Sequence, residues 1–259
     1  MPVHEFSNHS TTHFAAYIQD CINNYDSGNL FDYYFDENSL DETMIHQMLH
    51  PKRDSLLFSF AVSIINFDYE YYLKKCVSPV DCKSILEVFD SYKVVIPYYD
   101  RKLIETDDEY FYEYIFDLRG EYVDKLAHAI AKEALEILFL NRILLKDFHL
   151  RVAQYLDELD KDKYPELFRN NGTVYRNTYW PKWLESALFH REQGRCTLCN
   201  EDLSKLLYMD AKPQIDHIVP LALGGTNDTT NFQLLCATCN ADKRDHTIVT
   251  KNRRSSFFY

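Results

Sequence analysis

Two identical Cys-x-x-Cys pairs constrain the fold of this 259-residue chain more than any other feature. Cys196 and Cys199 form the first pair, in CTLC, and Cys236 and Cys239 form the second, in CATC. Four thiolates arranged in two such pairs can hold one zinc ion in tetrahedral geometry. The residues between the pairs, 200–235, must then form a unit that leaves the metal and returns to it.

A polar pair interrupts the apolar stretch inside that unit. In PQIDHIVPLALGG, Asp216 and His217 lie side by side, and Gly224 and Gly225 end the stretch. A buried ionisable side chain is costly unless it is paired, hydrogen-bonded or bound to a metal. The stretch is predicted to be extended, and the two glycines permit a tight turn with positive φ. The local order becomes strand, turn, strand, helix, with the last helix expected to begin after Cys239.

The combined motif closely resembles the HNH endonucleases, whose nuclease unit is called the ββα-metal fold. The residues that carry the resemblance read C-x-x-C, DHIVPLALGGTND-x-x-N-x-Q-LLC, and C-x-x-CN-x-x-K, in that order. The resemblance covers about residues 190–245 and does not reach residues 1–175. It implies a metal-dependent endonuclease that hydrolyses phosphodiester bonds of nucleic acid, with DNA favoured over RNA and with zinc in a structural role.

The resemblance also implies a role for each motif residue. His217 matches the general base that takes a proton from the attacking water, and Asp216 matches a ligand of the catalytic divalent metal. Asn231 matches the central asparagine, which ties the loop across the hairpin and holds the backbone of the histidine. Asn240 stands in the third signature position, where many members have histidine, so the chain looks like a His-Asn-Asn variety with Asn240 as a second metal ligand.

Physical chemistry agrees with these roles. An imidazole is well suited to accept a proton near neutral pH. Mg²⁺ or Mn²⁺ favours oxygen ligands such as the Asp216 carboxylate and the Asn240 amide, and such an ion polarises a phosphate. A strictly extended strand would point Asp216 and His217 to opposite sides. The bend that brings them to one site does not follow from the sequence.

Basic residues after the motif are candidates for binding phosphate. Lys243 and Arg244 follow Asn240 within about one helical turn, and they are predicted to contact nucleic acid. Arg253 and Arg254 are further candidates for the same role. An ordinary solvated charge is the alternative for all four.

The first 160 residues differ from the rest in composition. They contain only two glycines and are rich in Tyr, Phe, Leu and Ile, which favours helices. The clearest helical pattern begins near Glu121, with a break expected near Asn141 or Asp147. Residues 54–67 are predicted to be helical, with a strand as the alternative, and residues 92–99 are predicted to form a short strand.

The predicted fold class is mainly α with a small α+β domain. We expect a helical N-terminal domain at residues 1–160, a linker at 161–180 and a zinc-stapled ββα-metal HNH domain at 181–259. The linker assignment depends on its polar composition, with Pro165 and Asn171-Gly172 as turn signals.

Charge is distributed unevenly along the chain. Residues 1–150 hold 13 Lys and Arg against 26 Asp and Glu, whereas residues 151–259 hold 15 against 14. A nucleic-acid-binding surface usually has a basic footprint, so the acidic half is not expected to face phosphate. It could bind a regulatory protein partner, associate with itself, or serve solubility. The sequence shows no membrane-length apolar run and no signal peptide, which predicts a cytoplasmic protein without a membrane partner.

Three functions remain open at this point. The leading one is an endonuclease that acts as the effector of a bacterial defence or toxin system, with the N-terminal domain as regulator, an idea that rests on analogy. The second is a non-catalytic, zinc-containing module that binds nucleic acid or protein. The third makes the acidic half the main functional part, as a protein-interaction or nucleic-acid-mimic domain.

Overall fold

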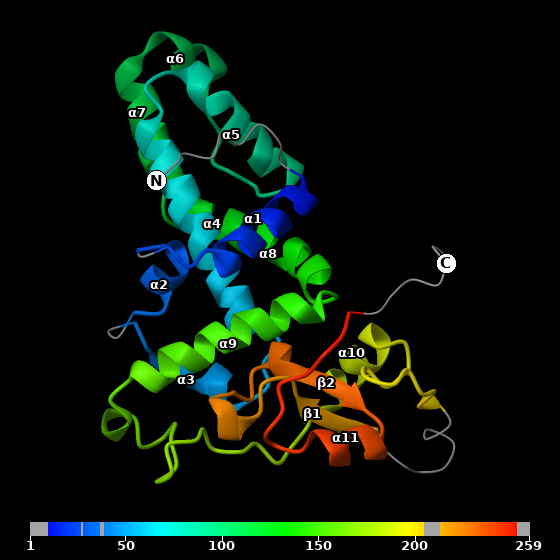
Figure 1. Cartoon of the computed structure of the whole chain (residues 1–259). Coiled ribbons are helices and arrows are strands. Elements are labelled where there is room, and N and C mark those ends of the chain that lie inside the picture. Colours follow the sequence, from blue (N-terminus) through cyan, green and yellow to red (C-terminus); the bar gives the residue numbers. More distant parts are fainter. Residues whose placement is uncertain (1–9, 27, 37–38, 205–212, 253–259) are drawn as a thin grey trace. The chain divides into compact units, whose positions relative to one another are not determined.

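The computed structural model describes residues 10–26, 28–36, 39–204 and 213–252 (Figure 1). This part of the chain is mostly helical, with a small two-stranded sheet near the C-terminus, which confirms the predicted fold class. The α-helices are α1 (Thr11–Asn23), α2 (Leu30–Tyr34), α3 (Glu42–Leu49), α4 (Leu56–Lys75), α5 (Pro79–Ser91), α6 (Arg101–Thr106), α7 (Asp108–Leu118), α8 (Glu121–Leu138), α9 (Arg142–Glu158), α10 (Lys182–Arg191) and α11 (Ala237–Lys243). The strands are β1 (Gln214–His217) and β2 (Phe232–Leu235), and short 3-10 turns are η1 (Lys161–Lys163), η3 (Leu221–Leu223) and η4 (Thr229–Asn231).

The chain divides into two compact units. The first includes residues 10–20 and 58–137, and it therefore takes most of α4 and α8 together with α5, α6 and α7. Its core contains fully buried aromatic side chains, among them Phe14, Phe60 and Tyr69. The rings of Phe14 and Tyr69 lie 6.4 Å apart, so apolar burial joins the start of the chain to α4 within this unit.

The second unit combines residues 21–57 with residues 138–252. Phe31 of α2 and Phe35, the C-cap of that helix, pack their rings against Phe148 of α9, at centroid distances of 5.8 and 6.0 Å. The guanidinium of Arg151, also on α9, donates to backbone carbonyls at the end of α1 and pairs with Asp32 at 2.8 Å. A segment from the N-terminal half thus packs with the C-terminal region. The domain boundaries proposed at residues 160 and 181 concern independent folding and stay a prediction.

The helix predictions can be compared directly with the structure. Asn141 separates α8 from α9, and its side chain accepts a hydrogen bond from the Leu144 N–H as the N-cap of α9. The break predicted near Asn141 is therefore confirmed, as is the helix predicted at residues 54–67, of which residues 56–67 lie in α4. The last helix begins at Ala237, two residues before Cys239 rather than after it.

The short strand predicted at residues 92–99 is wrong. The structure has no strand there, and no neighbouring segment pairs with it among the described residues. Val95 is 86% exposed and Tyr98 is 90% exposed, whereas Tyr92 and Tyr99 pack their rings against Phe14 and Tyr114. The segment thus buries some side chains against helices but has no partner strand in the part of the chain that the structure describes, and a β-strand needs one for its backbone hydrogen bonds. In the described ranges, no helix has both the length and the apolar content needed to cross a bilayer.

Candidate active site and metal centre

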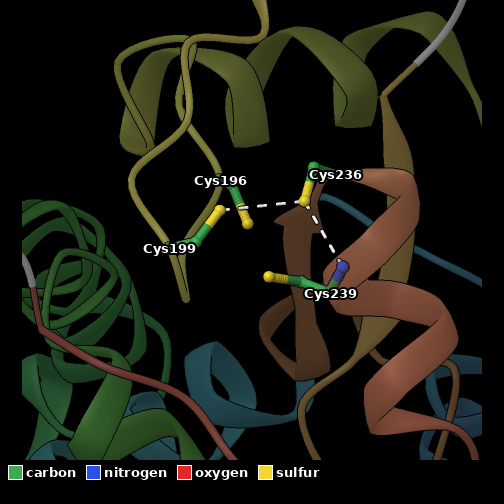
Figure 2. A group of neighbouring side chains, drawn as sticks. All are labelled: Cys196, Cys199, Cys236 and Cys239. Atoms are coloured by element: carbon green, nitrogen blue, oxygen red, sulfur yellow. Dashed lines mark hydrogen bonds between the residues drawn. The ribbon is translucent and has the colours of Figure 1, made fainter.

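The four paired cysteines meet in the structure. Their Sγ atoms all lie within 4.8 Å of one another, and Figure 2 shows the first pair on a loop and the second pair at the start of α11. The Cys199 and Cys236 sulfurs are 3.7 Å apart. Zn–S bonds of about 2.3 Å in a tetrahedron require sulfur separations of about 3.8 Å, so the cluster matches a zinc site in both chemistry and spacing.

Backbone N–H groups favour a thiolate at Cys196, whereas burial raises the pKa of Cys236 and of Cys239 in the metal-free cluster. Burial alone would raise the pKa of Cys196, but hydrogen bonds from the backbone of Cys199, Cys236 and Leu198 outweigh burial and lower that pKa to about 7. The Cys239 N–H donates to the Cys236 sulfur at 3.3 Å, which also caps α11. Metal binding requires thiolates, so groups that stabilise negative sulfur favour the metal-bound form.

The first Cys pair is attached to the sheet by the backbone. The N–H of Thr197 donates to the carbonyl of Leu234 at 2.9 Å, which places the loop beside β2. Cys196 and Cys236 share a small apolar cluster with Leu203, Leu234 and Leu235. The sheet is therefore closed at this end by the cysteine cluster together with a satellite core.

The strands β1 and β2 run antiparallel, and their register places the polar pair. Asp216 lies opposite Gln233, and His217 lies opposite Phe232. His217 is the last residue of β1, so the chain leaves the extended conformation directly after it. The bend that the sequence left open thus comes from the end of the strand.

Both glycines after β1 occupy positions where a side chain would strain the backbone or overlap a neighbouring backbone atom. Gly224 has φ of +83°, in the left-handed region that side chains with a Cβ avoid. A Cβ on Gly225 would lie only 1.9 Å from the Val219 carbonyl oxygen, a distance that no side chain can occupy. The loop after His217 therefore folds back on itself through backbone contact.

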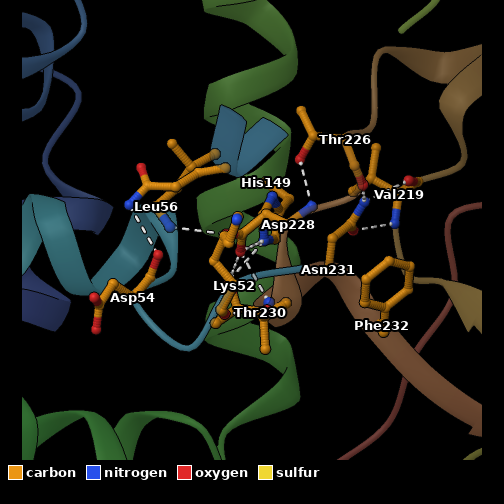
Figure 3. Close-up of polar contacts among 12 residues, drawn as sticks. Lys52, Asp54, Leu56, His149, Val219, Thr226, Asp228, Thr230, Asn231 and Phe232 are labelled. Atoms are coloured by element: carbon orange, nitrogen blue, oxygen red, sulfur yellow. Dashed lines mark hydrogen bonds and ion pairs between the residues drawn. The ribbon is translucent and has the colours of Figure 1, made fainter. Parts of the chain in front are cut away.

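Asn231 holds that loop from the other strand. Its Oδ1 accepts from the Val219 N–H at 2.9 Å, and its Nδ2 donates to the carbonyls of Val219 and Thr226 at 2.9 and 2.8 Å (Figure 3). Its own carbonyl accepts from the Ile218 N–H at 2.6 Å. Asn231 thus ties the segment that follows His217, which is the arrangement that the HNH resemblance implies for it.

Asp216 is half-buried and lies beside a lysine ammonium. Its Oδ2 accepts from Gln233 Nε2 at 2.9 Å and lies 3.1 Å from the Lys243 ammonium. Burial raises the pKa of Asp216, while Lys243 and Gln233 oppose that rise. Its Oδ1 has no hydrogen bond within the described part of the chain, so one oxygen is anchored and the other can serve as a metal ligand.

His217 is buried against aromatic rings. It is 6% exposed, and its ring centroid lies 4.8 Å from that of Phe232 and 6.1 Å from that of Trp180. Burial lowers its pKa to about 4, and the hydrogen bond to Asn227 only partly opposes this effect. The imidazole is therefore neutral near pH 7, which is the form that can accept a proton.

Comparison with known families agrees with this geometry. The family model described as HNH endonuclease matches residues 196–253. Residues 196–253 form an HNH endonuclease domain. The domain implies a phosphodiester hydrolase, and hence nuclease activity and nucleic acid as a binding partner. Comparison with curated proteins and with solved structures gave no match.

Helix α11 of the HNH domain presents one face to the polar pair. The Lys243 ammonium reaches Asp216 and also donates to the His217 carbonyl at 2.8 Å. Asn240 lies three residues earlier, on the same face of the helix, and is half-buried. Its side-chain amide forms no hydrogen bond with the residues the structure describes, which leaves it available as a ligand.

The predicted phosphate contacts have different surroundings. Lys243 is 4% exposed and already holds two partners, so a phosphate could reach its ammonium only by replacing them. Arg244 is exposed at the end of α11, with φ of +53°. Phosphate binding by either residue stays a prediction. Arg253 and Arg254 lie outside the described residues.

The sequence analysis missed two residues near the site. Arg176, in the predicted linker, is exposed, and its charge acts on both Asp216 and His217 after the larger effects described above. It opposes the burial that raises the pKa of Asp216, and it adds to the burial that lowers the pKa of His217. Asn227 contacts His217 directly, at 3.2 Å from its Nε2. Nothing in the polar sequence around Arg176 indicates that it lies near the site. Asn227 was interpreted as an ordinary turn residue, because asparagine is common in turns.

Proposed function

We propose that this protein is a metal-dependent endonuclease that hydrolyses phosphodiester bonds, with DNA as the favoured substrate. The supporting observation is the placement of Asp216 and a neutral His217 at the end of one strand, beneath the face of α11 that bears Asn240. The backbone after this pair is tied by Asn231. A carboxylate, a neutral imidazole and an amide in the same part of the HNH domain thus support the proposal.

Each residue has a defined part in the proposed reaction. His217 takes a proton from water as the water attacks phosphorus. Asp216 and Asn240 hold a divalent ion, Mg²⁺ or Mn²⁺, because both offer oxygen ligands. When bound, such an ion stabilises negative charge on the leaving oxygen. Arg176 and Arg244 are exposed cations suited to orient the flanking phosphates.

Nuclease activity is tested by incubating the zinc-loaded, full-length protein with plasmid, single-stranded DNA or tRNA. Each substrate is given Mg²⁺, Mn²⁺ or a chelator in excess. Cleavage should require the divalent ion, favour DNA, and fall at least about 100-fold in His217→Ala, because removing a general base costs that much. Cleavage that persists in His217→Ala with an unchanged rate would contradict the assigned role.

The acidic N-terminal region supports a regulated enzyme. We propose that the protein acts in the cytoplasm as an effector of bacterial defence or as a toxin, and that the N-terminal region recognises a protein partner or another copy of the chain. Uninfected cells should then tolerate expression, and phage infection should trigger DNA cleavage in cells with wild-type protein but not with His217→Ala. Degradation of host DNA without any trigger would contradict regulation.

A non-catalytic zinc module is the second candidate, and one observation favours it. The Lys243 ammonium lies 3.1 Å from Asp216, where it partly satisfies the carboxylate that a catalytic ion would need. If the protein only binds nucleic acid, it should retain labelled DNA and should not cleave it with Mg²⁺, with Mn²⁺ or with a chelator. In that case His217→Ala should bind as tightly as the wild-type protein.

A further inference from the structure

The side chain of Asn227 is fully buried beside His217, and each of its polar atoms has a partner. Its Nδ2 donates to the carbonyls of Tyr175 and Met48, at 2.7 and 3.3 Å. Its Oδ1 accepts from the Asn177 N–H at 3.1 Å and lies 3.2 Å from Nε2 of His217. Asn227 is 0% exposed, so water cannot take the place of these partners.

The two backbone environments fix which way this amide points. Carbonyl oxygens can only accept hydrogen bonds, so the end of the amide that faces Tyr175 and Met48 must be the NH₂ group. A backbone N–H can only donate, so the end that faces Asn177 must be the oxygen. A flipped amide would place donor against donor and acceptor against acceptor at a buried position, and both contacts would be lost.

The orientation of Asn227 determines the hydrogen position on His217. An amide oxygen faces Nε2, so Nε2 must carry the hydrogen and donate it. In a neutral imidazole the other nitrogen, Nδ1, then holds the lone pair. We infer that Asn227 is a positioning residue, which fixes the tautomer and ring orientation of His217 so that Nδ1 is the atom that accepts the proton from water. The catalytic consequence rests on the proposed function, whereas the tautomer does not.

The positioning contact depends on a segment far from the HNH motif. The Asn227 N–H also donates to the Met48 carbonyl, at 2.8 Å, so α3 holds both the backbone and the side chain of Asn227. The next two residues extend the same attachment. Asp228 accepts from the Leu56 N–H at 2.7 Å, and the Thr229 hydroxyl donates to the Lys52 carbonyl (Figure 3). Residues 48–56 therefore support the orientation of the base.

Nitrogen-15 NMR of the imidazole tests the tautomer directly, in the zinc-loaded full chain without Mg²⁺. Long-range proton–nitrogen spectra distinguish an Nε2-protonated ring from an Nδ1-protonated ring, and the signal that disappears in His217→Gln identifies His217. We expect the pattern of a neutral ring protonated at Nε2. An Nδ1-protonated pattern for the wild-type protein would overturn the inference, whether or not the protein cleaves nucleic acid.

Substitutions then test the consequence for catalysis. Asn227→Leu has a similar shape but offers His217 no acceptor, and we expect kcat to fall about tenfold to 100-fold with KM changed less than about threefold, because a misplaced base slows chemistry. Asn227→Asp keeps an oxygen facing Nε2, and its protonated carboxyl can donate to the Tyr175 carbonyl as the amide does. It should therefore recover part of that loss, and more of it at low pH than at high pH, because the carboxylate form would face two carbonyl oxygens. If Asn227→Asp folds but is no more active than Asn227→Leu, the positioning role is wrong.

Thr229→Val is the matched control. It removes one hydrogen bond between the same loop and residues 48–56, yet Thr229 does not contact His217. Its kcat and its His217 spectrum should match those of the wild-type protein. An equal loss of kcat in Thr229→Val and Asn227→Leu would assign the effect to general loosening of the loop. If Asn227→Leu fails to fold, the wild-type spectrum still decides the tautomer.

Discussion

The two ends of the β1–β2 hairpin are stabilised by different means. At one end, the strands lead into four cysteines whose sulfurs form a site for one metal ion. At the other end, the loop that joins the strands is held by hydrogen bonds to residues 48–56 and to α9. The first end depends on a motif that is local and can be recognised in the sequence. The second depends on segments that are distant in the chain: the Thr230–His149 contact spans 81 positions and the Asp228–Leu56 hydrogen bond spans 172.

The loop that joins the strands also differs from an ordinary turn in how deeply it is buried. Residues 226–231 read TNDTTN, a composition typical of exposed turns. All six are buried, with Asn227, Asp228 and Asn231 at 0% exposure. His149 of α9 lies 2.8 Å from the Thr230 hydroxyl and 3.4 Å from an Asp228 oxygen, so the buried carboxylate has polar neighbours on several sides. A loop of this kind stabilises the fold only while every partner is present.

The largest effect is expected at the metal end. Cys236→Ser should abolish zinc binding and unfold the HNH domain, because structural zinc sites contribute on the order of 10 kcal/mol to folding. Cys21→Ser changes a buried cysteine outside the cluster, and this variant should keep its zinc. Elemental analysis and limited proteolysis compare the two variants. A zinc-free Cys236→Ser protein with a protease-resistant HNH domain would show that hydrogen bonds alone hold this end.

A substitution at Gly225 tests the turn that connects the two ends. Gly225→Ala should lower the free energy of unfolding by at least about 3 kcal/mol, because the new Cβ would overlap the Val219 carbonyl and force the loop to move. Gly120→Ala is the comparison that isolates backbone strain from close approach, since Gly120 has φ of +74° but no atom within 4 Å of an added Cβ, whereas Gly225 has the close contact without a positive φ. The Gly120→Ala change should cost about 1 kcal/mol. Denaturant unfolding measures both, and equal losses would contradict the close approach.

Asp228→Asn tests the buried carboxylate at the loop end. We expect a loss of about 2 kcal/mol in the free energy of unfolding, because either orientation of the amide points its NH₂ group at a backbone N–H of Leu56 or Thr230. Asp242→Asn alters an exposed aspartate on α11 and should change stability by less than about 0.5 kcal/mol. Zinc content should stay unchanged in both variants. Loss of zinc in Asp228→Asn would show that the two ends are coupled.

The smallest effect is expected from Thr229→Val. The change keeps the shape of the side chain and leaves the Lys52 carbonyl without one hydrogen bond, so we expect a loss of about 1 kcal/mol. Thr230→Val should cost more, because the Thr230 hydroxyl lies between Asp228 and His149. Thermal unfolding of the two variants ranks them. The reverse order would place the main support of the loop at residues 48–56 and not at the buried carboxylate.

Several features were predictable because they depend on neighbours in the chain. The helix break at Asn141 was readable from its capping side chain, and Gly224 from its suitability for positive φ. The four cysteines were predicted to meet, and they do. The register that puts Asp216 and His217 at the end of β1 was not readable, and the catalytic roles of these residues and of Asn240 stay predictions.

Lys243 shows why some assignments need the folded chain. By sequence it is a cation on a helix near a nuclease motif, which suggests phosphate. In the structure it is buried between the Asp216 carboxylate and the His217 carbonyl. The sequence is consistent both with phosphate binding by Lys243 and with its burial beside Asp216. Only the packing of α11 against β1 distinguishes these two interpretations.

The metal end of the hairpin could be predicted from the sequence alone, because ligand identity and spacing within short segments specify a zinc site. The sequence also indicated the helical character of the first half, through composition and periodicity. The orientation of His217, in contrast, depends on contacts between segments that are distant in the chain. A turn-forming asparagine becomes a positioning residue when a distant carbonyl, that of Met48, fixes the direction of its amide. A hydrogen bond between residues 48 and 227 follows from the packing of whole helices and leaves no mark on either local sequence.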